Sequence, residues 1–137
     1  LLVPQLSGHD ARVVFVTSDG MYAQALRPDD PEYLRGDYSG TTAYARSKRA
    51  QVELLPALTR RWPGITVHAT HPGWAATPGV TDSLPTFARV MAPVLRDASA
   101  GADTTVWLMA TEPEPEGGRL WQDRAPRPST WPPPGRG

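Results

Sequence analysis

Residues 12–18 read RVVFVTS and residues 65–73 read ITVHATHPG. Both runs are rich in β-branched residues and end at turn-forming pairs, Asp19-Gly20 and Pro72-Gly73. Such runs are typical of strands buried in a parallel sheet. Between them, residues 42–62 place apolar side chains at helical spacing, and Pro63-Gly64 ends this pattern. Strand, helix and strand in this order predict a right-handed crossover unit of an α/β fold.

The rest of the chain is predicted from its turn residues and its helical spacing. Residues 19–41 carry the glycines and prolines of a loop, and Pro56 should kink the 42–62 helix. Helices are predicted over 84–95 and 98–110, and a short strand over 118–121. Residues 125–137 are too rich in proline for a packed element and predict an extended or disordered tail. We therefore expect a single domain over residues 1–124, followed by a tail over 125–137.

Composition excludes several classes of function. The chain has 137 residues and a formal net charge of zero, and it has no run of basic and aromatic residues, so nucleic acid is not an expected partner. The absence of cysteine excludes disulfides and thiolate chemistry. Neither a membrane span nor a signal peptide is evident, which favours a cytoplasmic location. Because the chain begins at Leu1, with its first methionine at Met21, we expect a fragment or a processed product.

Tyr44 and Lys48, the only lysine of the chain, are four residues apart in the predicted helix. This spacing places both side chains on one helical face, about 6 Å apart along the axis. A nearby cation stabilises a phenolate, so such a tyrosine can serve as a general acid or base. For the bare pair, however, a packed tyrosine beside a solvated lysine is the commoner arrangement.

Ser18 and the Pro72-Gly73 pair strengthen the catalytic interpretation. Each follows a predicted strand, so they belong at the carboxyl edge of the sheet, where open α/β folds bind their ligands. A serine hydroxyl there can donate to a substrate carbonyl oxygen while Tyr44 supplies the proton. Ser18 alone would be an ordinary residue at the end of a strand.

The segments VVFVTS, YARSK and ITVHATHPGWAATPGV together resemble the short-chain dehydrogenase/reductase family. That family combines a strand-end serine, Tyr-x-x-x-Lys, and a Pro-Gly loop followed by a threonine. The segments HPGWAATPGV and GGRLWQDRAPR are similar to the branch that includes the retinol-dehydrogenase-like proteins. The resemblance implies the C-terminal half of a Rossmann-type doubly wound parallel sheet over residues 1–124. In that half, residues 1–6 would be the end of the active-site helix.

The resemblance also implies an activity and a set of site residues. Ser18 would orient the substrate, Tyr44 would be the acid/base, and Lys48 would favour the phenolate form and bind the nicotinamide ribose. The implied reaction is hydride transfer between NAD or NADP and a small, lipophilic carbonyl or alcohol substrate, in a protein that forms homo-oligomers. The residues implied at the nicotinamide end of the cofactor are Pro72, Gly73 and Thr77.

The chain departs from the family pattern in three ways. No G-x-G-x-x-G turn is present to cradle the pyrophosphate, so the N-terminal nucleotide-binding half lies outside this chain. The sequence has no asparagine, although the family carries two at characteristic positions. Ser18 and Tyr44 are separated more widely than is common in the family. We therefore expect the chain by itself to be inactive, and the choice between NAD and NADP is not encoded in it.

Other interpretations account for fewer features. A metal site is not expected, because His68 and His71 belong on opposite faces of a strand. A hydrolase is disfavoured because Val16 stands where a nucleophile elbow requires glycine. The apolar residues within 84–95 fit a substrate lid, and they fit core packing or a partner surface at least as well. Three hypotheses remain: an oxidoreductase represented by its catalytic half, which we favour, a truncated non-catalytic interaction module, and an unrelated α/β binding protein.

Overall fold

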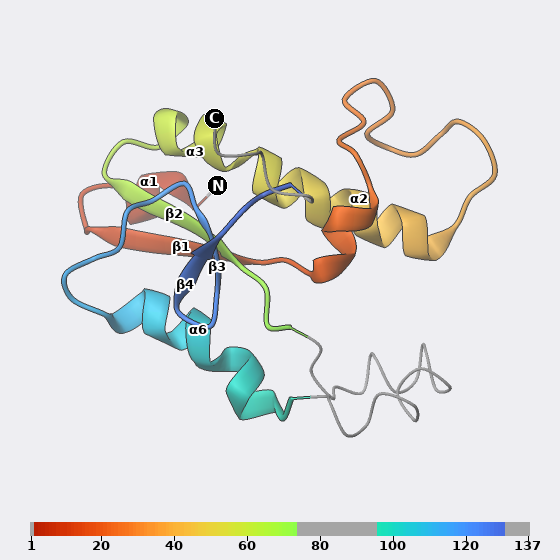
Figure 1. The fold of residues 1–137 in the computed structure, drawn as a ribbon. Coiled ribbons are helices and arrows are strands. Elements are labelled where there is room, and N and C mark those ends of the chain that lie inside the picture. Colours follow the sequence, from red (N-terminus) through yellow and green to blue (C-terminus); the bar gives the residue numbers. More distant parts are fainter. Residues whose placement is uncertain (1, 74–95, 131–137) are drawn as a thin grey trace, which may run out of the picture.

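The computed structural model describes residues 2–73 and 96–130, which form a sheet with helices on both faces (Figure 1). The strands are β1 (Ala11–Val16), β2 (Ile65–Thr70), β3 (Leu120–Gln122) and β4 (Ala125–Arg127), arranged in the order β1-β2-β3-β4. β2 is parallel to both β1 and β3, while β4 is antiparallel to β3. The prediction of an α/β fold with a parallel sheet is confirmed.

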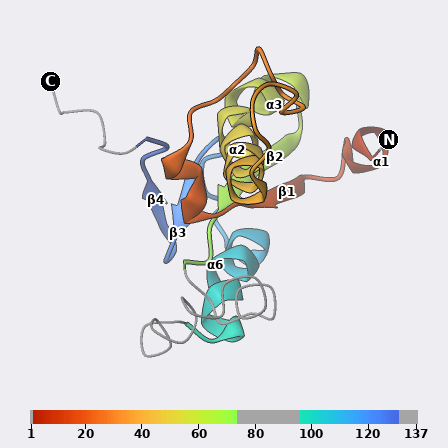
Figure 2. The same cartoon turned by 90° about the vertical axis from the view of Figure 1, so that its right-hand side faces the viewer.

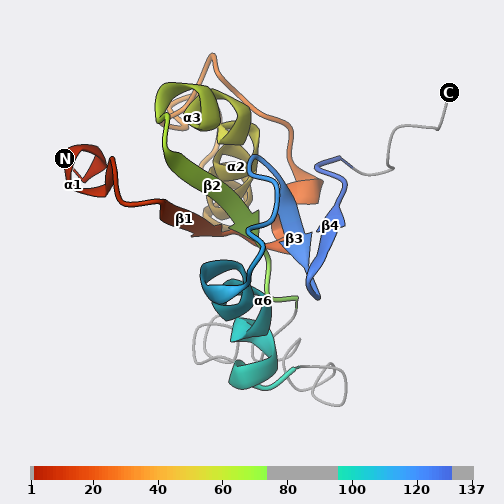
Figure 3. The same cartoon turned by 90° about the vertical axis from the view of Figure 1, so that its left-hand side faces the viewer.

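The crossover between β1 and β2 contains two helices, α2 (Gly40–Glu53) and α3 (Leu55–Arg61). They meet at Leu54, and Pro56 lies in the first turn of α3, where its missing N–H costs no hydrogen bond. The predicted kink is therefore a break between two helices. α2 and α3 cover one face of the sheet, and α6 (Ala98–Ala110) covers the other, as Figures 2 and 3 show.

The main core lies between the sheet and the α2–α3 layer. Alternate residues of β2 point into it, as expected for the period of two along a strand. A short 3-10 helix, η1 (Asp19–Ala23), closes this core near the carboxyl end of β1 and contributes the fully buried Met21. The buried residues of the cluster are Met21, Val52, Leu55, Ile65, Val67, Ala69 and Leu120.

The prediction that residues 125–137 form an extended or disordered tail is wrong for residues 125–129. Ala125–Arg127 form β4, and two carbonyls beyond it accept side-chain hydrogen bonds, Pro128 from Tyr22 Oη at 2.7 Å and Ser129 from Arg49. A proline within a strand is tolerated here because β4 has one partner strand and needs few N–H donors.

Three further predictions concern residues 84–95, residues 131–137 and residues 1–6. The helix predicted over 84–95 and residues 131–137 of the predicted tail lie outside the described residues. A short helix, α1 (Val3–Leu6), occupies the segment assigned to the end of the active-site helix. Within the described ranges, no helix is long and apolar enough to cross a membrane.

His68 is fully buried on β2, with its ring edge-on to Trp121 at a centroid distance of 6.1 Å. Burial lowers the pKa of His68 below its usual value, Arg12 lowers it further, and Glu114 opposes this. The unfolded chain therefore binds a proton at a higher pH than the folded protein does. Stability should fall as the pH drops below about 6.5, at up to ~1.4 kcal/mol per pH unit for this one group.

The change His68→Leu should flatten that acid-side slope without loss of stability at neutral pH. Neither ring nitrogen has a hydrogen-bond partner among the described residues, so leucine leaves no orphaned group behind. Chemical denaturation at several pH values between 5 and 8 measures the slope directly. An unchanged slope in the variant would show that His68 is not kept neutral by the fold.

Candidate active site

Ser18 lies just beyond β1 and forms the N-terminal cap of η1. Its backbone is extended, and its Oγ accepts a hydrogen bond from the N–H of Gly20 at 3.3 Å. A hydroxyl that accepts in this way still has its own hydrogen to donate. Ser18 can therefore donate to a carbonyl oxygen placed at the carboxyl edge of the sheet.

Tyr44 and Lys48 lie one turn apart on α2, as the sequence predicts. The Lys48 Nζ is 5.5 Å from the centroid of the Tyr44 ring, and it donates to the Val16 carbonyl at 3.0 Å. Thr17 Oγ1 donates to the Lys48 carbonyl at 2.9 Å, which ties this turn of α2 to the end of β1. Tyr44 is 51% exposed, so a ligand can reach this residue from solvent.

The predicted serine and tyrosine converge beside Gly20. A Cβ atom placed on Gly20 would lie 3.6 Å from Ser18 Oγ and 4.0 Å from Tyr44 Cε1. Both catalytic candidates therefore border the same small space, which a larger residue at this position would occupy. The structure thus brings together Ser18, Tyr44 and Lys48, which come from two separate segments of the chain.

The Pro72-Gly73 pair follows β2 at the same edge. Gly73 has a φ of +71°, a conformation that favours glycine, and a Cβ there would lie 3.2 Å from Nε of Arg96. The Arg96 side chain, at its Cδ, Nε and Cζ atoms, therefore packs against the Cα of Gly73. Thr77, the third residue implied at the nicotinamide end, lies outside the described residues.

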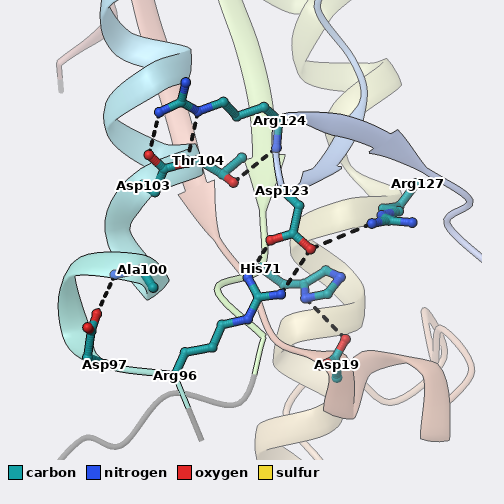
Figure 4. A network of polar contacts seen from close by, with 10 residues as sticks. All are labelled: Asp19, His71, Arg96, Asp97, Ala100, Asp103, Thr104, Asp123, Arg124 and Arg127. Carbon is teal, nitrogen blue, oxygen red and sulfur yellow. Dashed lines mark hydrogen bonds and ion pairs between the residues drawn. The ribbon is translucent and has the colours of Figure 1, made fainter. Parts of the chain in front are cut away.

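A polar network that sequence reasoning missed surrounds this loop (Figure 4). His71 Nδ1 is 3.1 Å from Asp19 Oδ1, and Arg96 pairs with Asp123 through both of its terminal nitrogens. Arg127 approaches Asp123 at 3.7 Å. The Arg96 hydrogen bond lowers the pKa of Asp123, and burial is the largest cause of a lowered pKa at His71. In the sequence, this network is indicated only by position, because Asp19 directly follows Ser18 and His71 directly precedes Pro72.

The residues at this edge fit the nicotinamide-ribose end of a dinucleotide. An ammonium carries three N–H bonds, so Lys48 can donate to ribose hydroxyls while it keeps its contact with Val16. Tyr44 is exposed beside it. No residues of this sequence match the glycine-rich turn that holds a pyrophosphate.

Comparison with known proteins finds sequence relatives of this chain. The model of the NAD dependent epimerase/dehydratase family matches residues 4–112. Dehydrogenase/reductase SDR family member 12 from Bos taurus is 42% identical over 96% of this chain, and its Homo sapiens counterpart is 42% identical over 91%. The chain belongs to the short-chain dehydrogenase/reductase family. The sheet described above is accordingly part of a Rossmann-like fold.

The matched short-chain dehydrogenases/reductases are longer than this chain. It covers 42% of the Bos taurus protein and 40% of the Homo sapiens protein, about two fifths of each. DnrU of Streptomyces sp. (strain C5), whose name describes a candidate daunorubicin C-13 ketoreductase, is 36% identical over 83% of this chain, which covers 39% of DnrU. The prediction of a short-chain dehydrogenase/reductase, made from three short motifs, is confirmed at the level of the family.

Proposed function

We propose that the protein carrying this chain is an NAD(P)-dependent oxidoreductase that interconverts a carbonyl compound and the corresponding alcohol, with Ser18, Tyr44 and Lys48 as its catalytic set. The observation that carries the proposal is the convergence beside Gly20, which Ser18 Oγ and the Tyr44 ring border together. The substrate would be a small molecule whose reacting oxygen reaches this edge of the sheet.

Each residue has a distinct task in the reducing direction. The Ser18 hydroxyl donates a hydrogen bond to the carbonyl oxygen and holds it beside Tyr44. The Tyr44 hydroxyl then transfers its proton to that oxygen as the alcohol forms. The Lys48 ammonium, held by the Val16 carbonyl, stabilises the tyrosinate that remains. A nicotinamide cofactor, when bound, supplies the hydride to the carbonyl carbon or accepts it in the reverse direction.

Two features of the comparisons support this proposal. The matching family model describes NAD-dependent proteins, and the name of one relative describes a candidate ketoreductase. In the reduction of a ketone, the carbonyl oxygen needs one hydrogen bond to hold it and one proton to become a hydroxyl. A serine donor and a tyrosine acid supply these two. NAD and NADP are equally compatible with the residues present.

The test is turnover by the protein that carries this chain, followed by the absorbance of the reduced nicotinamide with a panel of ketones and aldehydes. We expect oxidation of NADH or NADPH that depends on the carbonyl compound. Ser18→Ala should lower kcat by about 10²-fold, as expected for loss of one donor to the reacting oxygen. Ser7→Ala is the matched control, because the Ser7 hydroxyl is exposed and donates to the local Val3 carbonyl near α1. Equal rates in both variants would contradict the role of Ser18.

A further inference from the structure

Asp19 and His71 connect the two loops of the proposed site. Asp19 is the first residue of η1 and directly follows Ser18, while His71 directly follows β2 and precedes Pro72. Since β1 and β2 are adjacent parallel strands paired up to Val16 and Thr70, their ends place these two residues side by side. The His71 Nδ1 to Asp19 Oδ1 distance of 3.1 Å is a direct contact between the serine turn and the Pro-Gly loop.

We propose that the Asp19–His71 contact is a positioning device that sets the separation between the Ser18 hydroxyl and the Pro72-Gly73 loop. This inference rests on the proposed function and extends it, because the serine holds the substrate oxygen and the loop borders the nicotinamide end. Neither Asp19 nor His71 needs to touch the reacting atoms. They act through the residues adjacent to them in the chain.

The surroundings of His71 define how the contact is made. Its side chain is 2% exposed, whereas that of Asp19 is 29% exposed. The charged groups facing it are Asp19, Asp123, Arg96 and Arg127, and the Tyr22 ring lies edge-on at 6.5 Å. Burial lowers the pKa of His71, and the two carboxylates oppose this, so the imidazole is neutral at neutral pH. The 3.1 Å approach of Nδ1 to Asp19 Oδ1 does not have the geometry of a hydrogen bond. A neutral ring beside a carboxylate is nevertheless most favourable with its hydrogen on Nδ1.

Each side of the contact is fixed by a second interaction. On the serine side, Met21 N–H donates to the Ser18 carbonyl at 3.0 Å, and the buried Met21 side chain anchors η1 in the core. On the loop side, Arg96 lies over Gly73 and is held by Asp123. The Asp19–His71 contact is the cross-link between these two anchored parts, so its loss should change their spacing more than their stability.

The experiment compares Asp19→Ala, Asp19→Asn and Asp29→Ala in the protein that carries this chain. Alanine removes the carboxylate that approaches His71, and we expect kcat to fall by about tenfold to a hundredfold, the cost of misplacing a reacting group by roughly 1 Å. Asparagine keeps an Oδ1 that can accept from Nδ1–H and should restore most of kcat. Asp29→Ala removes a carboxylate that pairs with Arg27 and Arg35, so kcat should not change.

A spectroscopic readout separates this inference from the proposed function. The ¹⁵N shifts of the His71 ring report which nitrogen carries the hydrogen, with no need for turnover. We expect the Nδ1–H form in the wild type and in Asp19→Asn, and loss of that preference in Asp19→Ala. An Nε2–H form in the wild type, or equal kcat in Asp19→Ala and the wild type, would overturn the positioning role. Absence of any wild-type turnover would defeat the proposed function, and the ring tautomer would still decide whether the contact exists.

Discussion

The change Tyr44→Phe is expected to lower kcat by about 10³- to 10⁴-fold, the upper part of the range for a positioned general acid. Phenylalanine keeps the ring that borders Gly20 and the 5.5 Å distance to the Lys48 ammonium, but it has no proton to transfer. Affinity for the reduced nicotinamide, measured by its fluorescence, should remain close to that of the wild type. A loss confined to kcat would identify Tyr44 as the acid in the chemical step.

Tyr38→Phe is the matched control for this experiment. Tyr38 lies six residues earlier, is 74% exposed, and packs its ring on Tyr33 at a centroid distance of 5.5 Å. Loss of its hydroxyl should leave kcat within the error of the assay. If Tyr44→Phe kept most of the wild-type turnover, the proton would have to come from another group, and the assignment of the catalytic set would be wrong.

The change Met21→Ala is expected to reduce the free energy of unfolding by about 2–5 kcal/mol. Met21 is fully buried in the core cluster, and no part of its side chain is left in water. Alanine removes most of its apolar contacts and leaves a cavity under η1, the element that Ser18 caps. Urea denaturation of the purified variant measures the loss, and turnover should fall with it as the serine turn becomes less fixed.

Met109→Ala provides the comparison, because the same chemical change is made at a side chain that is 62% exposed on α6. A substitution at such a surface position should change stability by no more than about 0.5 kcal/mol. Equal losses in the two variants would mean that η1 is not packed as described. A large loss at Met21 alone would tie the position of the serine turn to the hydrophobic core.

The elements predicted well were those that a local pattern determines. Ala98–Ala110 is a helix with the predicted bounds, and the β2 strand differs from its prediction at one end only. β4 was missed because its three residues include Pro126, which reads as a breaker, and because its stability comes from pairing with β3 rather than from its own sequence. A short edge strand is stabilised by its partner strand, and the sequence of the edge strand alone does not indicate that partner.

The candidate site divides in the same way. The proximity of Ser18, Tyr44 and Lys48 could be predicted because each has a fixed place relative to a strand end or along one helix face. The contact between Asp19 and His71 could not be predicted, because it depends on the register that places Val16 opposite Thr70. Arg96 is more distant still in the sequence, and its place over Gly73 follows from tertiary packing alone.

The two residues of the turn between β3 and β4 show what this edge of the sheet requires of the sequence. Asp123 and Arg124 have φ values of 52° and 57°, a conformation that glycine adopts more easily by about 1 kcal/mol per residue. Yet Asp123 holds Arg96, and Arg124 reaches Asp103 on α6. An Asn-Gly turn would suit the backbone better, but it would remove the charge of Asp123 beside Arg96 and the whole Arg124 side chain that pairs with Asp103. The β3–β4 hairpin therefore connects α6 to the Pro-Gly loop through these two side chains. A turn chosen only for its backbone conformation would lose these connections.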